Sequence, residues 1–262
     1  MITWDNFNLF GICTLLTWIC AFILLFFKDK TKTAITISFV GLLVLGGFII
    51  LLWKSLDRPP MRTMGETRLL YSFFIVSVGF IIYSIWKYKW LLNYSLFVAS
   101  IFLIINLLKP EIHSKNLMPA LQSVWFVPHV TAYILSYAIL GAATIMGLKL
   151  LVSKEKKIDT KVLDLCDNLV YIGFGLLMLA MLMGAVWAKA AWGHYWSWDP
   201  KETWAFITAG AYLLYIHLRL NNLHQTKSIW ILIIAFICLM ITWKGVNYLP
   251  SAKNSVHVYS QT

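Results

Sequence analysis

The chain has 262 residues and a net charge of +11, with 60% hydrophobic and only 13% charged residues. An average soluble domain is about 45–50% apolar and about 25% charged, so this composition excludes an ordinary soluble domain and favours an integral membrane protein. The basic excess requires no nucleic-acid partner, because a lipid bilayer with anionic headgroups and the basic inner loops of membrane proteins account for it.

The hydrophobic residues are grouped in eight blocks of roughly membrane-spanning length. A helix needs about 20 apolar residues to cross the hydrocarbon core. The third and eighth blocks are shorter, but they are flanked by aromatic residues of the kind that anchor helices at membrane interfaces. In chain order the blocks cover residues 9–27, 34–53, 70–86, 91–108, 126–152, 168–188, 203–221 and 229–243. The sequence therefore predicts an all-α, polytopic membrane helix bundle of about eight transmembrane helices, forming one domain over residues 1–262.

The basic residues of the loops predict the orientation, since Lys and Arg concentrate in the loops on the inner side of a membrane. The short loops 28–33, 87–90, 153–167 and 222–228 have a higher density of basic residues than the other loops. We therefore expect both termini to lie on the outer side. The loop 191–204, between the sixth and seventh spans, is expected on the same side.

Two of the predicted outer segments precede the fifth span. Segment 57–72 contains two prolines, which interrupt a helix. Its Glu66 lies between two arginines, which favours either local ion pairs in a solvated loop or a loop that docks a partner. In segment 118–130, His129 follows Pro128 at the start of the fifth span, where proline suits the first helical turn. This histidine is therefore expected near the outer surface.

The third outer segment is "AWGHYWSWDPKETW", residues 191–204, and it holds four tryptophans. Trp196 and Trp198 alternate, so an extended backbone would place both on one face. Such a cluster favours a stacking platform for a large flat ligand. The alternative is an interfacial aromatic belt.

The end of this segment has the residue types of a helix start. Asp199 suits the N-cap, Pro200 the first helical position and Glu202 the third. The sequence therefore predicts that the seventh span begins here. Asp199 is expected to act as a cap, and this does not exclude a second role.

Histidines on the outer side are candidate ligands for a metalloporphyrin, because haem iron binds imidazole nitrogen. His129 and His257, the latter in the tail 245–260, lie on the predicted side of the tryptophan-rich loop; each is either an axial ligand or a polar surface residue. His217 lies within the seventh span, where ionisable residues are functional candidates, or it follows Arg219 as that side chain snorkels inward. The remaining histidines, His113, His194 and His224, are expected at the surface.

The tryptophan-rich segment resembles that of a known family. "WGHYWSWDP" is similar to the W-G-x-x-W-x-W-D pattern of the cytochrome c assembly proteins, which are haem-handling membrane proteins, and the following "KETW" resembles their CcsA/ResC branch. The stretches "RPPMRTMGETR", "PALQSVWFVPHV", "YIHLR" and "NYLPSAKNSVHVYS" also resemble that branch. The resemblance covers roughly residues 57 to 260.

The resemblance implies that haem b is presented at the outer membrane face to the CXXCH motif of an apocytochrome c. Two thioethers then form with the haem vinyl groups. It implies that His129 and His257 are the axial ligands of the haem iron and that His217 takes up haem from the inner side, as a possible ligand of a second haem. No catalytic residue is assigned. The loop residues that match the family pattern are Trp192, Gly193, Trp196, Trp198 and Asp199.

The family also implies a setting and a partner. The setting is the bacterial cytoplasmic membrane, and the activity is that of the haem-binding part of a holocytochrome c synthase. A CcsB/ResB-like membrane subunit is expected as partner, because the family's large outer domain and second transmembrane histidine belong to that subunit or to a fused extension, and this chain has neither.

Two other functions remain open at this point. The first is a b-type, quinone-linked electron-transfer cytochrome, although only His217 lies clearly within a predicted span. The second is a transporter or assembly factor, either a haem exporter without a ligation role or a haem-free protein whose tryptophans form a belt.

Overall fold

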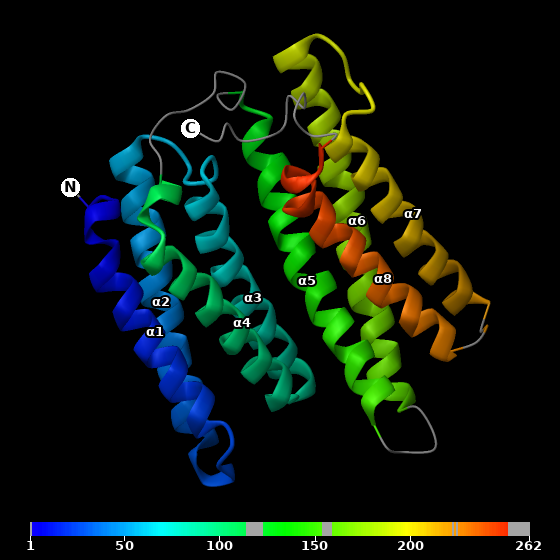
Figure 1. Ribbon diagram of the computed structural model, residues 1–262. Coiled ribbons are helices and arrows are strands. Elements are labelled where there is room, and N and C mark those ends of the chain that lie inside the picture. The colour runs from blue at the N-terminus through cyan, green and yellow to red at the C-terminus, as the bar shows by residue number, and fades with distance from the viewer. Residues whose placement is uncertain (1, 114–122, 154–158, 222, 224, 251–262) are drawn as a thin grey trace. The chain divides into compact units, whose positions relative to one another are not determined.

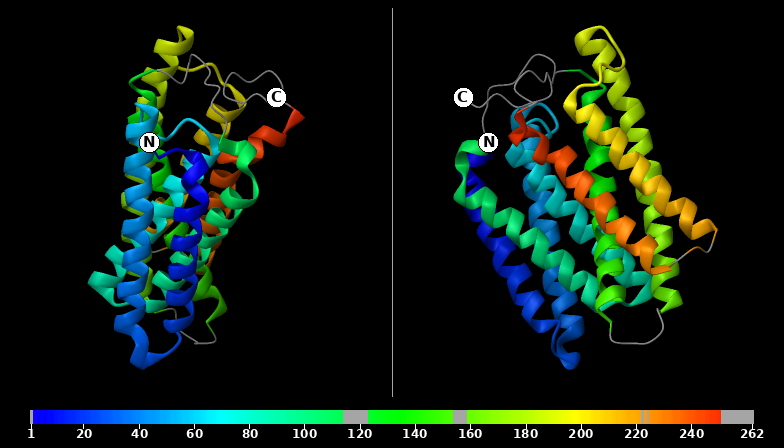
Figure 2. Two further views of the ribbon diagram at one scale, coloured as in Figure 1. Left: turned by 90° about the vertical axis from the view of Figure 1, so that its left-hand side faces the viewer. Right: turned by 45° about the vertical axis from the view of Figure 1, so that its right-hand side comes forward.

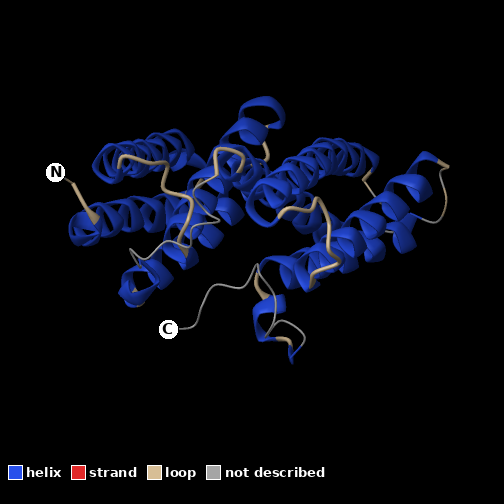
Figure 3. Cartoon of the chain, turned by 90° about the horizontal axis from the view of Figure 1, so that it is seen from above, coloured by secondary structure: helices blue, strands red, loops and turns tan. Residues whose placement is uncertain are grey.

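The structure is a computed structural model that describes residues 2–113, 123–153, 159–221, 223 and 225–250. All regular elements of these residues are helices (Figure 3), which confirms the predicted all-α class. Helices satisfy their own backbone hydrogen bonds, as a chain in hydrocarbon requires. The chain divides into two compact units, Met1–Gln122 and Ser123–Thr262. Whether they act as the single domain expected over 1–262 stays a prediction.

Unit 1 contains four long helices (Figure 1). Helix α1 packs against α2 and α4, and α3 packs against α4. The close approach of α1 and α2 depends on Gly41, since a Cβ there would lie 2.6 Å from the indole Nε1 of Trp18. The elements are η1 (Trp4–Asn6), α1 (Phe7–Leu24), η2 (Lys28–Lys30), α2 (Thr31–Leu56), α3 (Met64–Trp86), α4 (Lys89–Leu108) and η3 (Pro110–His113).

Segment 57–72, predicted to lie on the outer side, is organised around the buried carboxylate of Glu66. This carboxylate accepts a hydrogen bond from the Thr63 amide at 3.1 Å, and the Thr63 hydroxyl accepts one from the Glu66 amide at 3.1 Å, which caps α3. Arg58 donates two further bonds to Glu66, at 3.0 and 2.8 Å. The segment therefore contains an ion pair, but with Arg58 rather than with either arginine that flanks Glu66 in the sequence, and Glu66 is buried at the start of α3 rather than in a solvated loop.

Unit 2 contains four long helices, and consecutive ones are antiparallel (Figures 1 and 2). Helix α5 packs along α6 and α7 along α8, with less extensive contacts between α5 and α8 and between α6 and α7. The start of α5, the end of α6 and the start of α7 lie at one end of the unit, here called the loop end. The elements are α5 (Phe126–Val152), α6 (Thr160–Trp192), α7 (Pro200–Leu220), α8 (Gln225–Trp243) and η5 (Gly245–Tyr248).

Helix α5 covers the predicted block 126–152, whereas α6 is much longer than the predicted block 168–188. It includes residues 160–167, which were expected in an inner loop. With 33 residues at about 1.5 Å each, α6 is roughly 50 Å long, more than the hydrocarbon core of about 30 Å. Hydrophobicity marks only the part of a helix that lies in lipid, so the polar ends of α6 were missed.

Within the described residues, seven helices are long and apolar enough to cross a membrane. This makes the chain a multi-pass membrane protein. The exception among the eight long helices is α7, whose ends carry Lys201 and Glu202 on one side and His217 and Arg219 on the other. A crossing by α7 therefore stays a prediction.

Candidate functional site

The tryptophan-rich segment begins inside a helix, because Trp192 is the last residue of α6. Gly193 ends the helix with φ +88°, a left-handed conformation that favours glycine. The Lys189 ammonium donates a hydrogen bond to the Gly193 carbonyl at 2.7 Å. Gly193 is thus needed for the turn that leads into the loop, whatever else the segment binds.

The other end of the loop is the expected start of α7. The Glu202 carboxylate accepts hydrogen bonds from the amides of Ser197 at 2.8 Å and Asp199 at 3.2 Å. The Asp199 carboxylate accepts one from the Lys201 amide at 3.0 Å, and Pro200 occupies the first turn. Both carboxylates are buried. The predicted helix start is confirmed.

Between these two ends, Trp196 and Trp198 form an edge-to-face pair with centroids 5.8 Å apart and an interplanar angle of 86°. The expectation that an extended backbone places both on one face is wrong, because Trp198 has φ +58°. Bulky residues rarely adopt this left-handed conformation, and such strain is concentrated at functional sites. The strained backbone presents Trp198 with 62% of its surface exposed.

Each of these two indoles has a further feature that suits a ligand wall. The Trp198 ring meets the edge of Phe206 at 5.7 Å, so part of it is fixed in place by α7. The indole Nε1 of Trp196 is buried and has no hydrogen-bond partner among the described residues. A buried N–H without an acceptor is costly, and a ligand that accepts a hydrogen bond would remove that cost.

Trp192 belongs to a second aromatic group, which includes His129. Trp192 meets Trp187 with centroids 4.7 Å apart. The Trp187 ring in turn stacks on the His129 imidazole at 5.5 Å and 30°, and the edge of Phe126 packs against Trp187 at 5.2 Å. At the loop end of unit 2, Trp187 therefore lies between His129 of α5 and Trp192, the first tryptophan of the motif.

The orientation of His129 is set by α6. Its Nδ1 lies 2.8 Å from the carbonyl oxygen of Ala180. A carbonyl only accepts, so Nδ1 carries the proton and the lone pair is on Nε2. Gly184 leaves room for the ring, since a Cβ there would lie 2.5 Å from the imidazole Cε1. A histidine whose other nitrogen donates to a backbone carbonyl is the usual arrangement of an imidazole that binds metal through Nε2, so these residues fit a haem iron.

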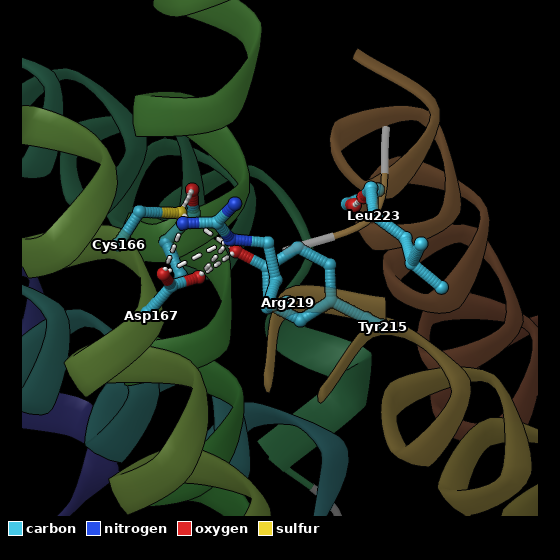
Figure 4. A network of polar contacts seen from close by, with 7 residues as sticks. Cys166, Asp167, Tyr215, Arg219 and Leu223 are labelled. Carbon is cyan, nitrogen blue, oxygen red and sulfur yellow. Dashed lines mark hydrogen bonds and ion pairs between the residues drawn. The ribbon is translucent and has the colours of Figure 1, made fainter. Parts of the chain in front are cut away.

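His217 lies near the opposite end of α7, where it is exposed. One of the two readings of His217 was that it follows Arg219 as that side chain snorkels inward, but Arg219 instead forms a buried ion pair with Asp167 of α6, at 2.7 Å (Figure 4). Since the carboxylate offers an ionic partner within the unit, the guanidinium does not need to reach the interface.

The other histidines differ in their surroundings. His194 is exposed, as predicted. His113 is instead stacked on Trp4, with centroids 3.8 Å apart and 13° between the planes, so the surface reading of His113 is wrong. His257 and His224 lie outside the described residues.

Comparison with known proteins tests the resemblance. The family model described as Cytochrome C assembly protein matches residues 6–252, nearly the whole chain. The chain belongs to the cytochrome c assembly protein family. Among its relatives, the cytochrome c biogenesis protein CcsA of Amborella trichopoda is 33% identical, over 87% of this chain and 85% of the relative. The proteins of the same name from Cuscuta reflexa and Prochlorococcus marinus (strain MIT 9301) are 28% and 35% identical, over 91% and 54% of this chain.

In this cytochrome c assembly protein, several residues around the candidate site were not identified from the sequence. Trp187 lies at the end of an apolar block, and it could have been found by counting back from Trp192. Gly184 and the Ala180 carbonyl carry no signal of their own, because their role arises from packing against His129. Asp167 was placed in a loop, although an acidic residue next to an apolar block is a signal for a buried pair.

Proposed function

We propose that this chain is the haem-handling subunit of a membrane cytochrome c synthase, which moves or receives haem b and presents it at the outer membrane face. A role in cytochrome c biogenesis follows from the family, and the finer assignment rests chiefly on His129. Its Nδ1 donates to the Ala180 carbonyl, its ring stacks on Trp187, and it lies at the same end of unit 2 as the tryptophan-rich loop.

We assign the residues of the candidate site different roles in holding haem. His129 supplies Nε2 to one axial position of the haem iron, and His257 supplies the other. Trp192, Trp196 and Trp198 provide aromatic surface for the macrocycle. Gly193 and Asp199 act indirectly, since one ends α6 and the other caps α7 and together they hold the loop.

The covalent step takes place between the haem and an apocytochrome c. Each thiol of the CXXCH motif adds across one vinyl group, so that sulfur bonds to one carbon and the thiol hydrogen goes to the other. The chain has no C-x-x-C pair of its own, and the reduced thiols and ferrous iron come from other components. In this proposal the chain holds and orients the haem.

The setting proposed is the bacterial cytoplasmic membrane, with a CcsB/ResB-like membrane subunit as partner. The tryptophan-rich loop and both termini face the extracytoplasmic side. His217 lies at the other end of α7, which suits a role in taking up haem from the inner side. The exposed position of His217 leaves its ring accessible to haem from outside unit 2.

The test is an absorption spectrum of the full chain co-purified with its partner subunit. We expect a bis-histidine haem spectrum, lower haem occupancy in His129→Ala and His257→Ala, and loss of holocytochrome c formation in both. His194→Ala is the matched control, because His194 is an exposed histidine of the tryptophan-rich loop, and it should change neither. Two observations together would instead support the electron-transfer cytochrome. These are redox turnover of the bound haem with quinone, and normal c-type cytochromes in a strain that lacks this protein. Haem-free protein from haem-replete cells would reject haem handling.

A further inference from the structure

Asp167, Tyr215 and Arg219 form a polar network between α6 and α7 (Figure 4). The Tyr215 hydroxyl donates to Asp167 Oδ1 at 2.5 Å. The Arg219 guanidinium donates from Nε to both carboxylate oxygens at 3.0 Å and from a terminal nitrogen to Oδ2 at 2.7 Å. The side chains of Arg219 and Asp167 are only 8% and 11% exposed. One carboxylate of α6 is thus the common acceptor for two residues of α7.

This network adds polar contacts where α7 packs sparsely against α6, although α7 packs extensively against α8. Helices α6 and α7 have fewer contacts than α5 with α6 or α7 with α8. The tryptophan-rich loop joins α6 to α7 at the loop end, and the network joins them near the other end (Figures 1 and 4). The polar contacts therefore supply a constraint on α7 that its packing against α6 does not.

The network identifies the face of α7 that meets α6. Tyr215 and Arg219 are four residues apart and lie on one helix face. His217 is two positions from each, or about 200° around the axis at 3.6 residues per turn. With Tyr215 and Arg219 held against Asp167, His217 points away from α6, and its exposure agrees with this.

We propose that Asp167 is a positioning residue for His217: through Tyr215 and Arg219 it holds α7 in the rotation that directs His217 out of unit 2 toward the haem it binds. This inference rests on the proposed function, specifically on haem binding by His217. The competing explanation is that the network only stabilises the fold. The two explanations can be separated by replacing the ion pair with apolar residues, because such a replacement often leaves stability unchanged. A positioning role would then still weaken haem binding by His217, whereas a purely stabilising role would not.

The experiment uses the full chain with His129→Ala and His257→Ala, so that histidine-bound haem depends on His217. Haemin titration followed by absorption measures the affinity for haem. The variant His217→Ala in the same background shows how much of that affinity is due to His217. The test variant is Asp167→Leu with Arg219→Met, which removes both charges and leaves no unpaired ion. The control is Asp164→Leu, the same change at an exposed position of α6.

We expect the double variant to keep its thermal unfolding temperature, to bind haem about tenfold more weakly and to lose the part of the absorption change that depends on His217, since residues that orient a metal ligand change affinity by about 10–100-fold. Tyr215→Phe, which keeps the ion pair, should show a smaller loss in the same direction even if the double variant does not fold. Haem affinity and spectrum equal to those of the Asp164→Leu control, in both variants, overturn the positioning role alone. If His217→Ala changes nothing in the starting background, His217 binds no haem, and both this inference and that part of the proposed function are overturned.

Discussion

The surroundings of His129 show how much a single small residue contributes to the candidate site. The imidazole lies against α6 at Gly184, where a Cβ would be 2.5 Å from Cε1 and 2.6 Å from Nδ1. Real Cβ atoms do not approach so closely, so any larger residue must displace the ring. Displacement would also lengthen the bond from Nδ1 to the Ala180 carbonyl, now 2.8 Å. The tautomer and the orientation of His129 therefore depend on the same glycine.

Gly184→Ala should weaken haem binding through His129 by about tenfold, the lower end of the effect of residues that orient metal ligands. Haemin titration in a His217→Ala background measures this. Gly175→Ala is the control, because Gly175 is in the same helix and a Cβ there has no neighbour within 4 Å. An alanine in a helix is favoured by up to about 1 kcal/mol over glycine, so the control should bind haem normally. Equal affinities in the two variants would contradict the role assigned to Gly184.

At the level of helices, the capping residues that start α7 also hold the conformation of the preceding loop. The Glu202 carboxylate bonds the amides of Ser197 and Asp199, so the capping interaction also holds the loop residues on either side of Trp198. The position of the exposed Trp198 indole therefore depends on the cap of α7. Asp199 is buried within it, which favours a structural rather than a direct role.

Asp199→Ala should lower stability by about 1 kcal/mol, the usual cost of losing an N-cap. It should also reduce haem occupancy, because fraying of the first turn of α7 displaces Glu202, whose carboxylate holds the loop amides. Asp199→Asn should retain both properties, since asparagine caps as well as aspartate. Thermal unfolding and haem content of the purified protein are the measurements. Thr63→Ala removes the corresponding cap of α3 and should lower stability without changing the haem bound through His129. A loss of haem in Asp199→Asn as large as in His129→Ala would show a direct contact instead.

At the level of the whole molecule, the open question is whether α7 crosses the membrane. Its apolar centre is flanked by Lys201 and Glu202 at one end and by His217 and Arg219 at the other. Arg219 is paired with Asp167, which lowers the cost of keeping it near the hydrocarbon. We therefore expect α7 to cross and the chain to have eight spans.

Two single cysteines test this in a background without the four native ones. His194→Cys precedes α7 and Lys227→Cys follows it, and both positions are exposed. In intact cells a membrane-impermeant maleimide should label position 194 at once and position 227 only after the membrane is opened. Labelling of both in intact cells would mean that α7 does not cross, and labelling of 227 alone would reverse the predicted orientation.

Features that depend on residues close together in the chain could be predicted from the sequence. Apolar blocks located the long helices, with α5 covering the predicted residues 126–152, and Asp199, Pro200 and Glu202 located the start of α7. These signals are local, because hydrophobicity and capping act within a few turns. The family pattern was likewise contained in one short segment.

Which residues meet across the bundle could be learned only from the fold. The Ala180 carbonyl is 51 residues from His129, and Asp167 is 52 residues from Arg219, so no local pattern relates them. The direction of His217 likewise follows from contacts made by Tyr215 and Arg219. Such pairs depend on how helices approach and rotate, which is set by the packing of many side chains at once rather than by the residues next to them in the chain.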